Sequence, residues 1–123
     1  MGTIKVAIVD DEKQILDMLE GFLHHTLKYS VKVYQNPLTA LEEIDHKIDI
    51  VLLDIMMPQM NGLELLPKLQ QKYPDLKVIM MTAYSTLDKV LESHRGGAIH
   101  YIMKPFDSLK GLEEKIESLA TVS

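Results

Sequence analysis

The feature that most constrains this fold is the segment 48–58, whose apolar, β-branched run ends on a carboxylate, Asp54. The run is too short to cross a membrane, and Pro58, Asn61 and Gly62 bound it on the far side. An apolar run of this length is typical of a strand buried on both faces of a parallel sheet. Ligands of open α/β sheets bind beyond the carboxyl ends of the strands, where Asp54 stands. Because an ionised Asp is rarely buried without a partner, this position predicts further polar groups at the same edge.

Strand-like and helix-like patterns alternate along the whole chain. Apolar or β-branched runs predict strands at about 4–9, 31–34, 48–54, 76–81 and 98–103. Apolar residues at helical spacing predict helices over about 12–27, 36–46, 63–73, 85–95 and 108–119. This alternation, without linker or repeat, predicts one domain over residues 1–123, a parallel sheet with helices on both faces. We expect a flavodoxin-like (βα)5 three-layer sandwich with strand order 2-1-3-4-5.

Helix boundaries carry three further expectations. Pro37 suits the first position of the second helix. Ser85 or Thr86 is expected to cap the fourth helix. Pro67 is expected to kink or delay the third helix unless it falls in the first turn.

Composition narrows the classes of function. The net charge of −5 argues against nucleic-acid binding by this domain, because phosphate binding needs clustered Lys and Arg. The absence of cysteine excludes disulfides and thiolate metal sites and is compatible with a reducing cytoplasm, where we expect the protein to reside. With no long apolar segment, no membrane association is expected.

Polar side chains stand at the ends of four predicted strands: Asp10 and Asp11, Asp54, Thr82 and Lys104. In the expected strand order the three acids converge, and two carboxylates about 4 Å apart repel by roughly 4 kcal/mol at an effective dielectric of 20. Such a cluster holds protons or recruits a cation, and oxygen-only ligands favour Mg2+. A single acid at a strand end is usually a cap or a solvated residue. The delivery of polar groups by four strands to one edge favours a functional site instead.

These groups suit phosphoryl transfer. A carboxylate such as Asp54 can attack phosphorus and form an aspartyl phosphate. Phosphoryl transfer depends mainly on positioning and charge neutralisation. Mg2+ and the Lys104 ammonium could neutralise the charge, and the Thr82 hydroxyl could bond one phosphoryl oxygen.

A family resemblance rests on motifs spread over nearly the whole chain: Asp10-Asp11, Asp54 with Pro58 and Gly62, Met81-Thr82-Ala83-Tyr84, and Lys104-Pro105-Phe106-Asp107. Together they resemble the receiver domain of two-component response regulators, and especially single-domain receivers of sporulation phosphorelays. The resemblance implies a signalling phosphoacceptor that assists its own phosphorylation and dephosphorylation but is not an enzyme. The phosphoryl donor would be a phosphohistidine of a sensor histidine kinase or of a histidine phosphotransfer protein.

The resemblance also implies roles for single residues. Asp54 would accept the phosphoryl group, and Thr82 and Lys104 would contact it. Mg2+ would be held by Asp11, by Asp10 partly through water, by Asp54 and by the backbone carbonyl of Met56.

Tyr101 occupies the family's aromatic switch position and would act with Thr82 to change the surface when Asp54 is phosphorylated. Met56 and Tyr84 resemble positions that tune the phosphoryl lifetime, and since neither can act as a general base, slow loss is expected. The Lys104–Pro105 bond is commonly cis in relatives.

Two other protein classes fit the sequence less well. A haloacid dehalogenase phosphatase would need a second Asp where this chain has Met56, and a flavodoxin would need a phosphate-cradling loop where Asp10-Asp11-Glu12 stands. The serious alternative is the N-terminal receiver of a longer DNA-binding or enzymatic regulator, with residues 121–123 as a tail or the start of a linker. In either case a monomer or a weak, phosphorylation-dependent dimer is expected.

Overall fold

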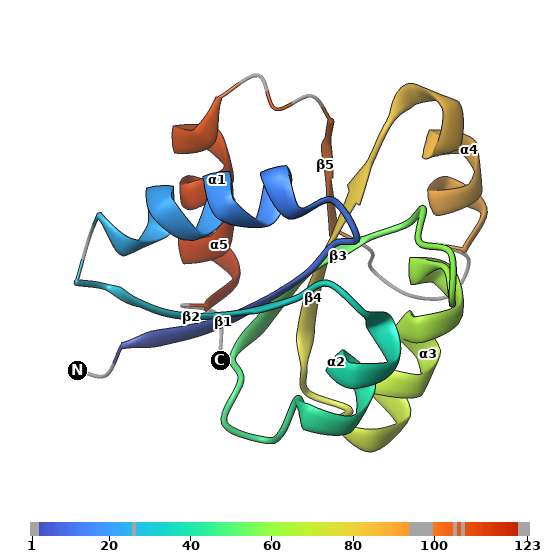
Figure 1. Ribbon diagram of the computed structural model, residues 1–123, viewed down its shortest axis with the longest axis horizontal. Coiled ribbons are helices and arrows are strands. Elements are labelled where there is room, and N and C mark those ends of the chain that lie inside the picture. Colours follow the sequence, from blue (N-terminus) through green and yellow to red (C-terminus); the bar gives the residue numbers. More distant parts are fainter. Residues whose placement is uncertain (1–2, 26, 94–99, 105, 107, 121–123) are drawn as a thin grey trace.

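Strands and helices alternate along the chain in the computed structural model, which describes residues 3–25, 27–93, 100–104, 106 and 108–120 (Figure 1). The strands of these ranges are β1 (Ile4–Val9), β2 (Tyr29–Tyr34), β3 (Ile50–Asp54), β4 (Lys77–Thr82) and β5 (His100–Met103). The helices are α1 (Lys13–His24), α2 (Pro37–Glu43), α3 (Gly62–Lys72), α4 (Tyr84–Ser93) and α5 (Leu109–Ala120).

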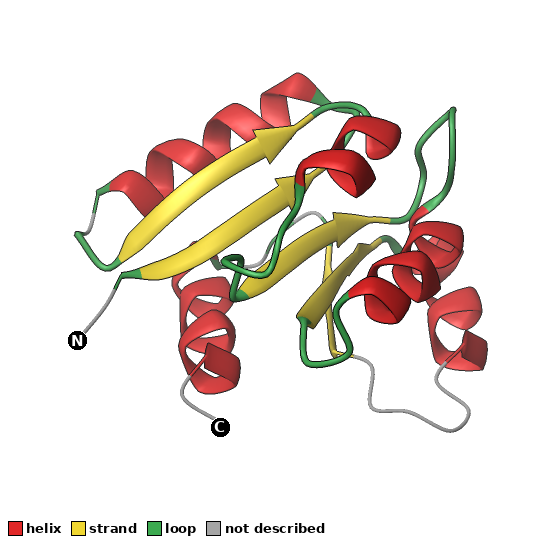
Figure 2. Ribbon diagram, turned by 90° about the horizontal axis from the view of Figure 1, so that it is seen from below, coloured by secondary structure: helices red, strands yellow, loops and turns green. Residues whose placement is uncertain are grey.

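The strands form one parallel sheet in the order β2-β1-β3-β4-β5, which confirms the predicted flavodoxin-like topology. Helices α1 and α5 cover one face of the sheet, and α2, α3 and α4 cover the other (Figures 1 and 2). Because all strands run parallel, their carboxyl ends meet at one edge of the sheet. No helix in the described ranges is long and apolar enough to cross a bilayer.

The central strand, β3, is buried along its whole length. Every residue of β3 is buried, as expected for a strand covered by helices on both faces. Leu53 packs with the side chains under α2, α3 and α4, whereas Leu52 packs with those under α1 and α5. The alternation of side chains along the strand thus divides the apolar residues into two cores.

Side chains at the helix starts match local sequence signals. The Asn36 carboxamide accepts from the Leu38 N–H at 2.8 Å, and Pro37 occupies the first turn of α2 as predicted. The Asn61 carboxamide accepts from the Glu64 N–H at 2.9 Å at the start of α3. Each bond satisfies a backbone donor that has no partner within its own helix.

The expected cap of α4 is wrong in position, and the expected delay of α3 does not occur. Helix α4 begins at Tyr84, so Ser85 and Thr86 lie inside its first turn rather than before it. Helix α3 begins at Gly62 and continues through Pro67, which therefore does not delay the helix. Pro67 points to solvent while Leu65, Leu66 and Leu69 are buried, and this apolar packing offsets the lost backbone hydrogen bond.

Gly62 sits where the connection after β3 folds back on the strand end. Its N–H donates to the Ile55 carbonyl at 2.8 Å. A Cβ at this position would overlap the backbone carbonyl of Asp54 and lie 3.1 Å from the Ile55 Cα. Glycine is required here because the backbone beside Asp54 leaves no room for a side chain.

Gly62→Ala is expected to destabilise the protein by about 1–3 kcal/mol, because the atoms it would overlap belong to backbone and cannot rotate away. Gly21→Ala is the matched control. Gly21 lies within α1, where a Cβ would meet no described atom within 4 Å, so alanine should stabilise that helix by about 0.5–1 kcal/mol. Urea unfolding measures both values, and equal changes in the two variants would contradict the close-approach argument.

Candidate functional site

The Lys104 ammonium lies among carboxylates at the carboxyl edge of the sheet. Its Nζ donates to Asp10 Oδ2 at 2.6 Å and to Asp54 Oδ1 at 3.1 Å, and it lies 3.6 Å from Glu12 Oε1. Asp10 is fully buried and Asp54 is 5% exposed. This arrangement confirms that the strand ends bring both acids and the lysine together. Charge-assisted bonds of this kind are the stronger class of protein hydrogen bonds.

Backbone pairing places these side chains. Asp10 directly follows β1, Asp54 ends the neighbouring β3, and Lys104 directly follows β5. Strand β4 lies between β3 and β5, so the Lys104 side chain reaches across its end to the acids. The Lys104 N–H donates to the Thr82 carbonyl at 2.7 Å, which fixes the start of this reach on β4.

Burial and neighbouring charges shift the pKa values of the site. Burial raises the pKa of Asp54 to about 7, the charges of Asp10 and Asp11 add to the rise, and Lys104 opposes it. Burial likewise raises the pKa of Asp10 against the hydrogen bonds from Lys104 and the Glu12 N–H. Burial lowers the pKa of Lys104, but its bonds to the two carboxylates outweigh that effect and raise it.

Three neighbouring acids lie close together beside Lys104. Carboxylate oxygens of Asp10, Asp11 and Glu12 lie within 4.8 Å of one another, with Asp10 buried and Glu12 exposed. Three carboxylates offer only hard oxygen ligands, so this donor set fits a hard cation such as Mg2+. Glu12 was not among the predicted metal ligands, although it directly follows Asp10-Asp11 in sequence. Its reach to Lys104 depends on the turn into α1.

Thr82 lies at the end of β4 and is 2% exposed. Its hydroxyl oxygen lies 2.6 Å from the hydroxyl oxygen of Thr86 and 3.2 Å from the carbonyl of Ala83. The hydroxyl thus bonds to the start of α4 and not to the acids. The sequence indicated Thr86 only as a helix cap, because its contact with Thr82 depends on the turn that leads from β4 into α4.

The remaining predicted positions are partly described. Met56 is 62% exposed and, with Asp11, lines a hollow beside the acids. Tyr101 is half-buried on β5, and the Lys115 ammonium lies 5.6 Å from its ring centroid. The Tyr84 side chain, Pro105 and the Lys104–Pro105 bond lie outside the described part of the structure. The roles predicted for these residues stay predictions.

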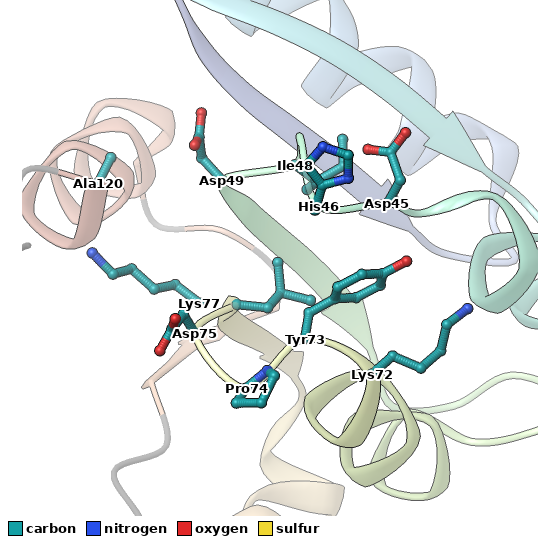
Figure 3. A pocket seen from close by; sticks show the side chains of 11 residues that line it. Asp45, His46, Ile48, Asp49, Lys72, Tyr73, Pro74, Asp75, Lys77 and Ala120 are labelled. Carbon is teal, nitrogen blue, oxygen red and sulfur yellow. The ribbon is translucent and has the colours of Figure 1, made fainter.

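A second hollow, of about 410 Å³, lies near the amino ends of β3 and β4 (Figure 3). Its two lysines are engaged in bonds to helix ends: Lys72 donates to the Leu41 carbonyl of α2, and Lys77 to the Leu119 carbonyl of α5. Lys72 also lies 5.6 Å from the Tyr73 ring centroid. These contacts satisfy carbonyls near helix C-termini, so the lysines act structurally there.

The raised pKa of Asp54 predicts how stability varies with pH in metal-free solution. The folded state holds this proton up to about pH 7, whereas the unfolded chain loses it near 3.8. Stability should therefore fall as pH rises from about 4 to about 7, by up to about 4 kcal/mol from this group.

Asp54→Asn should remove most of this fall, and Asp17→Asn, on the exposed side of α1, serves as the control. Urea unfolding in a chelating buffer across this pH range measures the difference. Parallel curves for the wild type and Asp54→Asn would contradict the assignment.

Comparison with known proteins places this geometry in a family. Residues 6–117 match the family described as "Response regulator receiver domain". The transcriptional regulatory protein MalR of Bacillus subtilis is 40% identical over 85% of this chain and 45% of its own length. The DNA-binding transcriptional regulator NtrC of Escherichia coli is 40% identical over 83% of this chain and 22% of its own length. The chain thus spans less than half the length of these curated relatives.

Solved structures agree with the sequence match. A CheY-like response regulator receiver domain protein from Methanospirillum hungatei JF-1 is 34% identical, with a TM-score of 0.83. The superposition covers 97% of this chain and 94% of that protein. The family match spans most of the sequence and the fold is the same. This chain belongs to the family of response regulator receiver domains.

Proposed function

We propose that this receiver domain takes a phosphoryl group from a phosphohistidine onto Asp54 and changes its surface in response. The observation that carries the proposal is the Lys104 ammonium, which is hydrogen-bonded to both Asp10 and Asp54 at the sheet edge. The phosphohistidine would belong to a sensor histidine kinase or to a histidine phosphotransfer protein. The chain acts as a signalling phosphoacceptor that assists its own phosphorylation and dephosphorylation, not as an enzyme on other substrates.

The reacting atom is a carboxylate oxygen of Asp54. Lys104 bonds to Oδ1, and Oδ2 has no partner among the described side chains. No described buried side-chain oxygen lacks a partner, so Oδ2 reaches solvent. Oδ2 attacks phosphorus, the bond from phosphorus to the imidazole nitrogen breaks, and the electron pair leaves with the imidazole. The Lys104 ammonium is placed to balance charge on the phosphoryl oxygens.

Receiver domains bind Mg2+ at an acidic pocket, and the carboxylates of Asp10, Asp11 and Glu12 fit that ion. We propose that Asp10, Asp11 and Asp54 hold it, together with the backbone carbonyl of Met56, and that Glu12 contributes from the rim. When bound, the ion neutralises charge on the phosphoryl oxygens.

The response and its duration are also part of the proposal. Thr82 and Tyr101 would reorient when Asp54 carries a phosphoryl group, shifting the population of surfaces near α4 and β5. Met56 stands exposed beside the acids and offers no group that could activate a water. Because neither Met56 nor Tyr84 would activate a water, loss of the phosphoryl group is expected to be slow.

A second candidate function follows from the relatives. Both curated relatives are named as transcriptional regulators, and this chain matches less than half of each. The same receiver would then control a further domain of a longer regulator. The receiver alone, with a net charge of −5, is not expected to bind nucleic acid. The reading frame downstream of codon 123 in the gene distinguishes the two candidates.

Incubation with acetyl phosphate and Mg2+ should add one phosphoryl group to the wild type and none to Asp54→Asn. Of the two acids hydrogen-bonded to the Lys104 ammonium, Asp10 is fully buried, whereas Asp54 has an oxygen that reaches solvent. Intact-mass spectrometry measures the increment. Asp75→Asn, an exposed acid before β4, is the control and should be labelled fully. Full labelling of Asp54→Asn would refute the assignment.

Mg2+ should raise the unfolding free energy by about 1.4 kcal/mol at ten times its dissociation constant, because it binds the folded acids and relieves their repulsion. Asp11→Ala should abolish this increase, whereas Asp17→Ala should keep it. Thermal unfolding with and without Mg2+ measures the change. An increase that survives in Asp11→Ala would exclude Asp11 as a ligand.

A further inference from the structure

The Thr82 hydroxyl is already engaged in a closed set of bonds at the start of α4. The Thr82 and Thr86 oxygens are 2.6 Å apart, and both residues are almost fully buried, at 2% and 5% exposure. The Ala83 carbonyl lies 3.2 Å from each hydroxyl oxygen. The Ala83 N–H in turn donates to the Thr86 oxygen at 3.2 Å.

The Thr82 hydroxyl has no proton left to give to the Asp54 side. Each threonine hydroxyl has one proton to give. If Thr82 donates to Thr86, then Thr86 donates to the Ala83 carbonyl; if Thr86 donates to Thr82, then Thr82 donates to that carbonyl. In both arrangements the Thr82 proton is used at α4. To donate to a phosphoryl oxygen, the hydroxyl must give up its present acceptor, which is the Thr86 oxygen in one arrangement and the Ala83 carbonyl in the other. A turn of the Thr82 side chain toward Asp54 would break the 2.6 Å contact with Thr86 in both arrangements.

We propose that Thr86 is a positioning residue whose hydroxyl holds the Thr82 hydroxyl at α4, so that a phosphoryl group on Asp54 must compete with Thr86 for it. This inference rests on the proposed function of Asp54. A β-branched side chain occupies few discrete rotamers, so the hydroxyl exchanges between defined partners. A net bond between buried hydroxyls favours the α4-bound arrangement about fivefold, which corresponds to about 1 kcal/mol.

The proposal gives the first turn of α4 a role in the response. When the Thr82 hydroxyl leaves, Thr86 loses its shortest hydroxyl contact. The first turn of α4 then has one hydrogen bond fewer to hold it in place. Coupling between two sites is reciprocal. A partner that holds the α4 turn in its present geometry would therefore weaken phosphoryl binding by the same factor by which a phosphoryl group weakens binding of that partner.

The test measures binding of beryllofluoride, a phosphoryl mimic, in the presence of Mg2+, followed by two-dimensional NMR. Thr86→Val should raise the apparent affinity about fivefold, because Thr82 is released from competition. Thr86→Ser keeps the hydroxyl and should restore the wild-type affinity. Thr39→Val, in α2, controls for the loss of a threonine hydroxyl from a helix. Thr86→Ala replaces the valine variant if valine does not fold.

A double-mutant cycle separates positioning from helix capping. In a Thr82→Val background the Thr86→Val change should leave the affinity unaltered, because there is no hydroxyl to release. A purely structural role predicts lower stability with equal affinity for wild type and Thr86→Val, and that result would overturn the inference, as would a lower affinity. Failure of the wild type to bind beryllofluoride would instead refute the proposed function.

One measurement on the unaltered protein completes the test. Three-bond couplings to the Thr82 methyl carbon report its χ1 angle, which should change when beryllofluoride binds. A bound state with the unliganded χ1 would show that Thr82 does not leave Thr86.

Discussion

The Lys104 ammonium is the interaction on which the rest of this site depends. It lies 2.6 Å from an oxygen of Asp10 and 3.1 Å from one of Asp54, at the end of a sheet whose interior is apolar. Without this cation, two buried carboxylates would face each other with no compensating charge, which proteins seldom tolerate. The apolar strands β1 and β3 can thus carry buried acids at their ends because Lys104, after β5, supplies the compensating positive charge.

The two hydrogen-bond donors predicted to contact a phosphoryl group already have partners. Lys104 is bonded to carboxylates, and Thr82 to Thr86. A phosphoryl group that bonds to the Thr82 hydroxyl therefore replaces a partner that this hydroxyl already has. Exchanges of this kind have small net free energies, because one hydrogen bond replaces another. A small difference between two arrangements is what allows a modest ligand interaction to shift a population.

Much of this molecule follows from the sequence because its main signals are local. The buried run of β3 and the alternation of patterns predict a parallel sheet, and the flavodoxin-like fold supplies the strand order. With that order, strand-end geometry predicts the meeting of Asp10, Asp54 and Lys104. The contact between Thr82 and Thr86 was missed, since it depends on α4 beginning at Tyr84. Where several residues could cap a helix, tertiary packing decides between them, and packing is not a local signal.

The contact between Lys104 and Asp10 joins residues 94 positions apart. A contact of such sequence separation closes a long loop, and loop closure costs entropy before the contact can repay it. During synthesis, β1 and β3 can pair as soon as residue 54 is available, but their acids have no lysine until the fifth strand is made. We expect the nascent chain to carry an uncompensated acidic edge over this interval. The site is thus complete only after most of the sheet that supports it has been synthesised.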